Sequence, residues 1–95
     1  MAELSADTVV HAALTGLVVD RVTLKSAAGG RVKILNRDAS TPIYYRLDGV
    51  DPVVGGSESF VVPAGQSDTF SPTQAPVEVR LVSALAAAYT VSVMQ

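Results

Sequence analysis

The sequence contains neither cysteine nor tryptophan, and aromatic residues make up only 5% of its 95 residues. The absence of cysteine excludes a disulfide framework, a thiolate zinc site and a cysteine nucleophile. The scarcity of aromatic residues leaves Val, Leu, Ile and Ala to build the core, and β-branched residues favour strands over helices. A chain of this length is sufficient for one domain with a single core.

Long runs of one kind of residue are also missing. The basic and acidic residues are spread along the chain, whose net charge is −2, so no block of charge indicates a nucleic-acid or anionic membrane partner. The longest apolar run, from Ala84 to Tyr89, is too short to span a bilayer. The first residues include acid where a signal peptide would carry Lys or Arg. We therefore expect a soluble protein that is made in the cytoplasm and binds neither nucleic acid nor membrane.

Alternation of apolar and polar residues is the main structural signal. From Val77 to Met94 it occurs on both sides of a small-residue break, which predicts two antiparallel strands in a C-terminal hairpin. Similar patterns, separated by turns that contain Gly, Pro or Asp, predict further strands at residues 17–24, 31–36, 42–48, 58–62 and 67–70. The sequence therefore predicts an all-β fold, a single small antiparallel β-sandwich or partly open barrel of about six to eight short strands.

Residues 1–16 do not show this strict alternation. Ser5 and Asp7 would suit helix caps, and Val10 would share a helical face with Leu14, but an extended arm fits the same residues equally well. We expect an N-terminal arm or short helix over residues 1–16, followed by the β-sandwich domain over residues 17–95. Deletion of residues 1–16 should then weaken association and leave the β-domain folded.

No residue pattern points to catalysis or to metal binding. His11 is the one histidine, and it has no cysteine or second histidine to join in a metal site or catalytic triad. Asp48, Asp51 and Glu58 lie close together in the sequence, but their spacing is not that of a calcium-binding loop, and Asp before Gly or Pro commonly forms turns. We predict a protein that is not an enzyme and that has no catalytic, cofactor-binding or metal-binding residues.

The tyrosine pair Tyr44 and Tyr45 leaves one alternative open. In a strand the two side chains point to opposite faces, so we expect at least one to be exposed. An exposed tyrosine can stack on a sugar ring. A carbohydrate-binding or adhesion module, with Tyr44 beside a polar cluster, is therefore an alternative function.

Several motifs carry a family resemblance. They are V-K-I-L-N-R-D-A-S-T-P-I-Y-Y-R-L-D-G, then D-P-V-V-G-G, F-V-V-P-A-G, V-E-V-R-L-V-S-A and A-Y-T-V, and together they cover about residues 31–94. In these motifs the chain resembles a type of small protein from tailed bacteriophages, especially those that infect actinobacteria. The motifs are mostly turn residues between β-strands, and residues 1–30 lie outside the resemblance.

The resemblance implies a β-sandwich virion structural protein without catalytic residues. It favours a capsid decoration (minor capsid) protein on the capsid surface, which binds across and stabilises major capsid subunits and contacts neighbouring copies of itself, with a homotrimer as the natural form. A neck or tail structural component is the alternative within the same class.

Partner contacts are expected from two groups of residues. Apolar residues in and next to the N-terminal segment would touch the capsid or a neighbouring copy. Outward-facing basic residues would meet an acidic capsid surface. The alternative for these basic residues is that they lie on strand faces in contact with solvent alone. The predicted partner-binding residues are Val9, Val10, Leu14, Leu17, Arg31, Lys33, Arg46 and Arg80.

Overall fold

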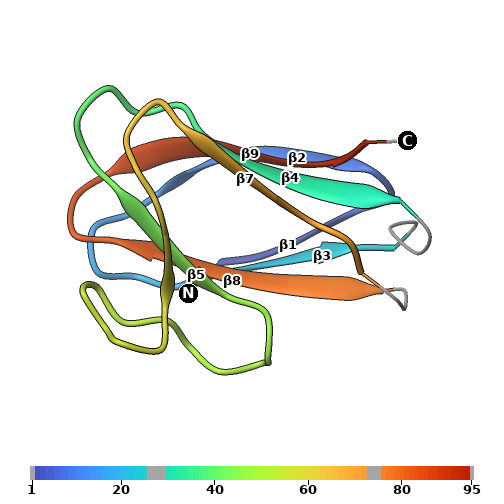
Figure 1. Ribbon diagram of the computed structural model, residues 1–95, viewed down its shortest axis with the longest axis horizontal. Coiled ribbons are helices and arrows are strands. Elements are labelled where there is room, and N and C mark those ends of the chain that lie inside the picture. The colour runs from blue at the N-terminus through green and yellow to red at the C-terminus, as the bar shows by residue number, and fades with distance from the viewer. Residues whose placement is uncertain (1, 26–29, 73–75, 95) are drawn as a thin grey trace.

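The computed structural model describes residues 2–25, 30–72 and 76–94, which form nine strands and no helix (Figure 1). The strands are β1 (Ala2–Ala6), β2 (Val9–Leu14), β3 (Asp20–Leu24), β4 (Arg31–Asn36), β5 (Ile43–Arg46), β6 (Phe60–Val62), β7 (Ser67–Phe70), β8 (Val77–Ser83) and β9 (Ala87–Met94). They make a five-stranded sheet, in the order β1-β3-β8-β5-β6, and a four-stranded sheet, in the order β2-β9-β4-β7. The expected all-β, sandwich-like class is confirmed, but the strand number is higher than the six to eight expected.

From β2 to β9 the first strand pairs with the last, the second with the second-last, and so on inward. Antiparallel pairs form between β2 and β9, β3 and β8, β4 and β7, and β5 and β6. Strands β2 to β9 therefore form one long hairpin, with its tip between β5 and β6. Successive strand pairs of this hairpin belong alternately to the two sheets. Further pairing of β9 with β4 and of β8 with β5 holds the rolled hairpin together. This connectivity is that of a jelly roll.

The predicted C-terminal hairpin is wrong in its pairing. The two strands form where alternation predicts them, but β8 belongs to the five-stranded sheet and β9 to the four-stranded sheet. The short link between them passes beside the link from β2 to β3, where the Leu17 amide donates to the Ser83 carbonyl. A Cβ on Gly16 would lie 2.9 Å from the Ala84 carbonyl oxygen, so this close crossing requires glycine.

The expected N-terminal arm or short helix is replaced by two strands. β1 pairs in parallel with β3, at the edge of the five-stranded sheet, and β2 pairs with β9, at the edge of the four-stranded sheet. Val10 and Leu14 of β2 lie in the core, with Leu14 only 1% exposed. Alternation is hard to see in β2 because its outward positions carry Val9 and Ala13, which are apolar and yet exposed.

The core consists mainly of aliphatic side chains that the two sheets bury between them. Its fully buried members are Leu14, Val22, Leu24, Val32, Ile34, Ile43, Val62, Val79, Leu81, Tyr89 and Val91. The inward positions predicted at residues 22, 24, 32 and 34 are confirmed. β4 and β7 have the predicted bounds, whereas β3, β5 and β6 are shorter than predicted. The turn predicted at residues 27–30 falls mainly outside the described residues.

Two tyrosines hydrogen-bond from one sheet to the other. The Tyr89 hydroxyl, on β9, donates to the Asp20 carboxylate on β3 at 2.9 Å, and the Tyr45 hydroxyl, on β5, donates to Asp68 on β7 at 3.0 Å. Burial raises the pKa of both hydroxyls above the ordinary tyrosine value, and the adjacent carboxylates raise it further. These bonds satisfy polar groups at the inner surfaces of the sheets.

Candidate functional site

Function must be sought on the outside of the jelly roll, because apolar side chains fill the space between the sheets. His11 lies exposed on β2, where its Nδ1 is 2.8 Å from the Thr90 hydroxyl oxygen. Within residues 2–25, 30–72 and 76–94 there is no group of three or more His, Asp or Glu side chains that could hold a metal ion. The same residues include no helix that could cross a membrane.

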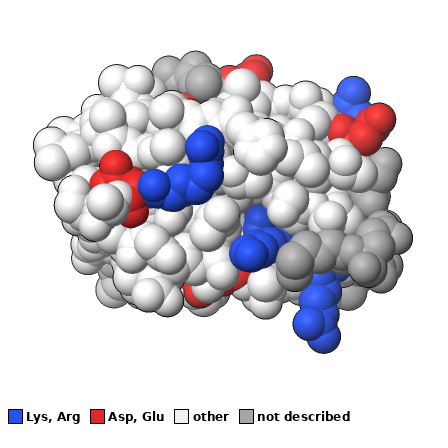
Figure 2. All heavy atoms as spheres, turned by 90° about the horizontal axis from the view of Figure 1, so that it is seen from above, with Lys and Arg blue, Asp and Glu red and all other residues white. Residues whose placement is uncertain are grey.

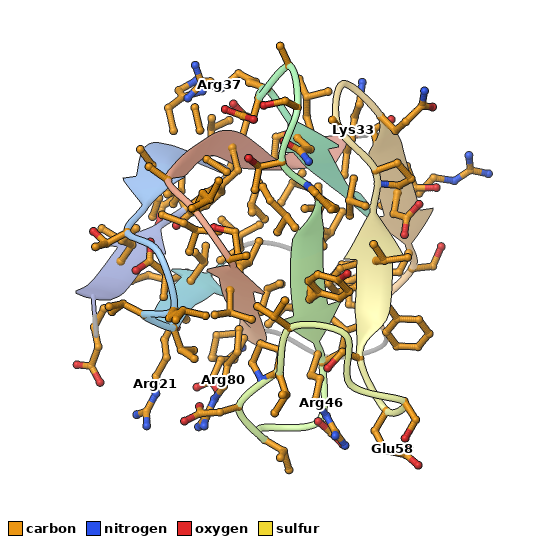
Figure 3. All side chains as sticks on the ribbon, turned by 90° about the vertical axis from the view of Figure 1, so that its left-hand side faces the viewer. Arg21, Lys33, Arg37, Arg46, Glu58 and Arg80 are labelled. Atoms are coloured by element: carbon orange, nitrogen blue, oxygen red, sulfur yellow. The ribbon has the colours of Figure 1, made fainter. Side chains whose placement is uncertain are left out.

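The outer face of the five-stranded sheet carries a row of charged residues. Strand register places Glu3, Arg21, Arg80 and Arg46 side by side on β1, β3, β8 and β5. Figure 3 shows the three arginines on the same side of the molecule. Like charges directly opposite one another destabilise a sheet, so this row requires neighbouring carboxylates.

Each arginine of this row has a carboxylate partner. Arg21 lies 3.3 Å from Glu3, and Arg80 contacts both Glu78 (2.6 Å) and Asp51 (2.7 Å). The Asp51 contact draws the loop between β5 and β6 toward this face, and the neighbouring Pro52 is buried.

The third arginine is held from within the same loop. The Arg46 Nε donates to the Asp48 carboxylate at 3.0 Å, and this bond is the main reason that the pKa of Asp48 falls to about 2. The predicted turn role of Asp48 is confirmed, since its carboxylate also accepts from the Val50 amide and Gly49 has a positive φ of 77°. The charges of this face are therefore largely balanced within the protein.

The outer face of the four-stranded sheet differs in charge. Its residues form two rows across β2, β9, β4 and β7, which are Val9–Ser92–Lys33–Thr69 and His11–Thr90–Leu35–Ser67. The only carboxylate in these four strands is Asp68, which accepts from Tyr45 on the inner side. Figure 2 looks at the molecule from the side of this sheet and shows a mostly uncharged surface with scattered basic side chains, some of which have acidic neighbours around the edge of the view.

The structure divides the eight predicted partner-binding residues among four environments. Val9, Arg31 and Lys33 lie on the outer face of the four-stranded sheet, and Arg46 and Arg80 lie on the charged row of the other sheet. Val10 and Leu14 lie in the core. Leu17, which is 72% exposed with a φ of 62°, lies in the link between β2 and β3.

Sequence analysis did not single out Arg37, and for the carbohydrate alternative it named Tyr44 rather than Phe60. The Arg37 guanidinium donates to the carbonyls of Tyr89 (3.1 Å) and Ala12 (3.4 Å), and so joins β9 and β2 at the end of the four-stranded sheet. Phe60 is 57% exposed at the edge strand β6. Neither role has a local signal, because both depend on strands that meet only in the folded chain.

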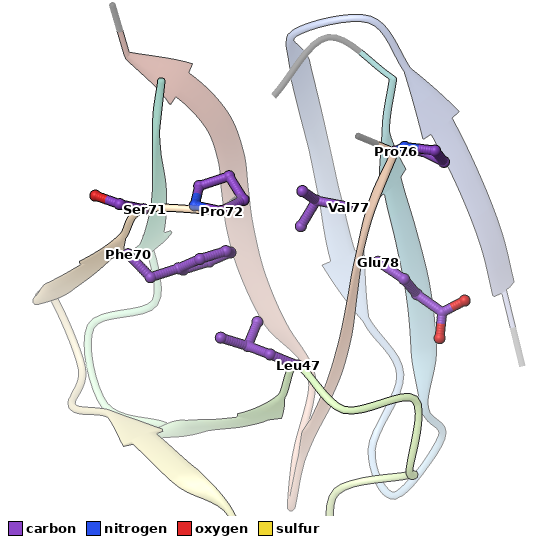
Figure 4. Close-up of a pocket in the computed structure, with 7 residues that line it drawn as sticks. All are labelled: Leu47, Phe70, Ser71, Pro72, Pro76, Val77 and Glu78. Carbon is purple, nitrogen blue, oxygen red and sulfur yellow. The ribbon is translucent and has the colours of Figure 1, made fainter. Parts of the chain in front are cut away.

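A hollow of about 390 Å³ opens at one end of the sandwich (Figure 4). Its lining residues are Leu47, Phe70, Ser71, Pro72, Pro76, Val77 and Glu78. Glu78, the one charged residue of this lining, already contacts Arg80. This lining offers apolar contact and no pair of titratable groups for acid–base chemistry.

No protein-family model matches the chain, and no curated protein matches it. A solved structure does resemble it. A de novo designed double-stranded β-helix, determined by solution NMR, superposes with a TM-score of 0.61 over 90% of this chain and 97% of the designed chain, at 17% sequence identity. At this identity the likeness shows the fold alone, and it agrees with the rolled-hairpin connectivity.

Proposed function

We propose that this protein is a non-enzymatic structural component of a phage virion, and specifically a capsid decoration (minor capsid) protein that binds across major capsid subunits. The observation that carries the proposal is the outer face of the four-stranded sheet, where Val9, Arg31 and Lys33 lie without an outward-facing carboxylate in the strands. The resemblance of residues 31–94 to bacteriophage proteins indicates the partner, which is the major capsid subunit.

The shape of this face suits contact with another protein. On β9 this face carries small side chains, Ser92 and Thr90, which lie between the larger residues Val9 and His11 on β2 and Lys33 and Leu35 on β4. Small side chains at these positions leave room for a partner surface to approach the sheet. Arg31 and Lys33 would meet acidic groups on the capsid subunit, which would orient the protein and make its association sensitive to salt.

The mechanism is mass action on the assembled shell. A protein that contacts adjacent capsid subunits binds the shell and not the free subunits, so its binding free energy is added to the stability of the shell. A homotrimer would repeat the same contact about a symmetry axis and multiply the effect of a weak individual contact. The open edge of the four-stranded sheet at β2 is a place where neighbouring copies would meet.

The test combines light scattering with sedimentation. The mass of the purified protein is measured first, and the protein is then sedimented with empty capsids of the phage that carries it. We expect co-sedimentation at a fixed ratio to the major capsid subunit. Failure to bind capsids, together with binding to isolated tails or necks, would overturn the capsid proposal in favour of a neck or tail component.

Two charge reversals then test the proposed face. Lys33→Glu should reduce capsid binding, whereas Lys25→Glu, the same change at an exposed residue just beyond β3, should not. Equal losses in both variants would show that net charge, and not this face, governs binding.

A further inference from the structure

A second surface lies at the tip of the rolled hairpin, apart from the face proposed to bind the capsid. It is a hollow of about 310 Å³ between the end of β5 and the start of β6, lined by Arg46, Leu47, Asp48, Glu58 and Phe60. Figure 3 shows Arg46 and Glu58 at the same end of the molecule, on the side away from Lys33 and Arg37. A hollow of this volume is within the range of small-molecule sites.

One wall of the hollow is an aromatic ring that is both exposed and held in place. Phe60 is 57% exposed, and its ring stacks on Tyr45 with centroids 5.3 Å apart and an interplanar angle of 28°. Tyr45 is in turn fixed by the bond from its hydroxyl to Asp68. An oriented aromatic ring in solvent is a ready platform for a ligand with an apolar face, because little side-chain freedom is lost on binding.

The rest of the lining is polar and partly oriented in advance. The guanidinium of Arg46 is held by two hydrogen bonds to Asp48, which leaves further donor and acceptor positions on both groups. Glu58 makes no ion pair or side-chain hydrogen bond with the described residues, and its charge adds to the Asp48 bond in raising the pKa of Arg46. The hollow therefore places two carboxylates and one guanidinium around one aromatic ring.

We propose that this hollow is a binding subsite for a neutral saccharide. A pyranose ring has a face of C–H groups, which would stack on the negative face of the Phe60 ring, and an edge of hydroxyls, which would bond to Glu58, Asp48 and Arg46. Two carboxylates against one guanidinium disfavour a phosphate or an acidic sugar. The proposal places a carbohydrate site at Phe60 and not at Tyr44, the residue of the alternative function. Tyr44 is half-buried between Val61 and Val82 on the outer face of the sheet.

The test is an NMR titration of the ¹⁵N-labelled protein with glucose, galactose, mannose, rhamnose and N-acetylglucosamine at millimolar concentrations. We expect at least one sugar to cause saturable shifts of the amides at residues 46–48 and 58–60. Phe60→Ala should weaken this binding about tenfold. Val53→Ala, at an exposed residue of the same loop that does not line the hollow, should leave it unchanged.

A second variant keeps the test independent of any effect of Phe60 on folding. Glu58→Gln retains the shape of the side chain and should also weaken binding. Absence of saturable shifts with all five sugars would overturn the subsite, as would binding that neither variant changes. If Phe60→Ala abolishes capsid binding and the unmodified protein binds no sugar, Phe60 belongs to a protein contact instead. The Lys33→Glu result bears only on the capsid face, so the two proposals fail separately.

Discussion

The two sheets of this jelly roll present different outer faces. On the five-stranded sheet, Arg21, Arg80 and Arg46 lie in one row, and each has a carboxylate partner within the protein. On the four-stranded sheet, Lys33 lies among small polar and apolar residues, and the strands carry no outward-facing carboxylate. The difference indicates that charge on the first face supports the fold, whereas charge on the second remains available to a partner.

The edge strands of the two sheets provide the largest expected difference. Leu14 of β2 is fully buried in the core, whereas Leu4 of β1 is only partly buried against it. Leu14→Ala should lower the free energy of unfolding by about 2–5 kcal/mol, and Leu4→Ala by less. Urea denaturation measures both, as a shift in midpoint at constant slope. Equal losses of unfolding free energy in the two variants would contradict the assignment of β2 to the jelly roll and of β1 to an additional edge strand.

The same contrast revises the expected effect of an N-terminal deletion. Removal of residues 1–16 takes away Leu14 and one of the two strands that pair with β9, so we expect the protein to unfold. Circular dichroism of this deletion, beside a deletion of residues 1–6, would separate the two strands.

The next largest effect concerns the bonds between the sheets. Tyr89→Phe leaves the buried Asp20 carboxylate without its hydroxyl donor and should cost about 1–3 kcal/mol. Tyr45→Phe should cost less, because Asp68 is only half-buried at an edge strand. Denaturation at neutral pH tests the order, and a larger loss in Tyr45→Phe would reverse it.

These tyrosines also predict an alkaline limit to stability. Folding raises the pKa of both hydroxyls, so the unfolded chain loses its tyrosine protons first, and the stabilisation is complete only below the unfolded value of about 10. The free energy of unfolding should therefore fall as the pH rises above about 10. Tyr89→Phe should make this decline shallower, which denaturation at increasing pH would show; an unchanged slope would contradict it.

A smaller effect is expected at acid pH on the five-stranded face. The Arg46 bond lowers the pKa of Asp48 to about 2, so its stabilisation is present above the unfolded value of about 4 and is lost as the pH falls toward 2. Asp48→Asn should lower the melting temperature at neutral pH and reduce its dependence on pH in this window. An identical acid profile in the variant would show that the ion pair does not contribute.

The smallest effect on stability is expected on the four-stranded face. Lys33→Glu should change the free energy of unfolding by no more than about 0.5 kcal/mol, because this face supplies no ion-pair partner that folding depends on. Arg80→Met should lower the melting temperature more, since it leaves Glu78 and Asp51 without their guanidinium. The reverse order would remove the distinction between the two faces.

Sequence analysis located most strands and their inward residues but not their partners. Alternation along Val77–Met94 identifies two strands, yet the same alternation fits a hairpin and two strands in different sheets, because pairing is decided by register over the whole roll. The N-terminal strands escaped notice because exposed Val9 and Ala13 mask the alternation of β2.

The outward direction of Arg31, Lys33, Arg46 and Arg80 followed from the alternation. Their separation into a balanced and an unbalanced face did not, because the Arg80 contact with Asp51 joins residues that are 29 positions apart.

Photo-crosslinking to the capsid tests the central claim most directly. A photoreactive amino acid is placed at Thr69, exposed on the four-stranded face, and in a second protein at Val61, exposed on the outer side of β6 in the five-stranded sheet. Each protein is irradiated with empty capsids. Our account predicts a crosslink to the major capsid subunit from position 69 and none from position 61. A crosslink from position 61 alone would show that the capsid-binding face has been assigned to the wrong sheet.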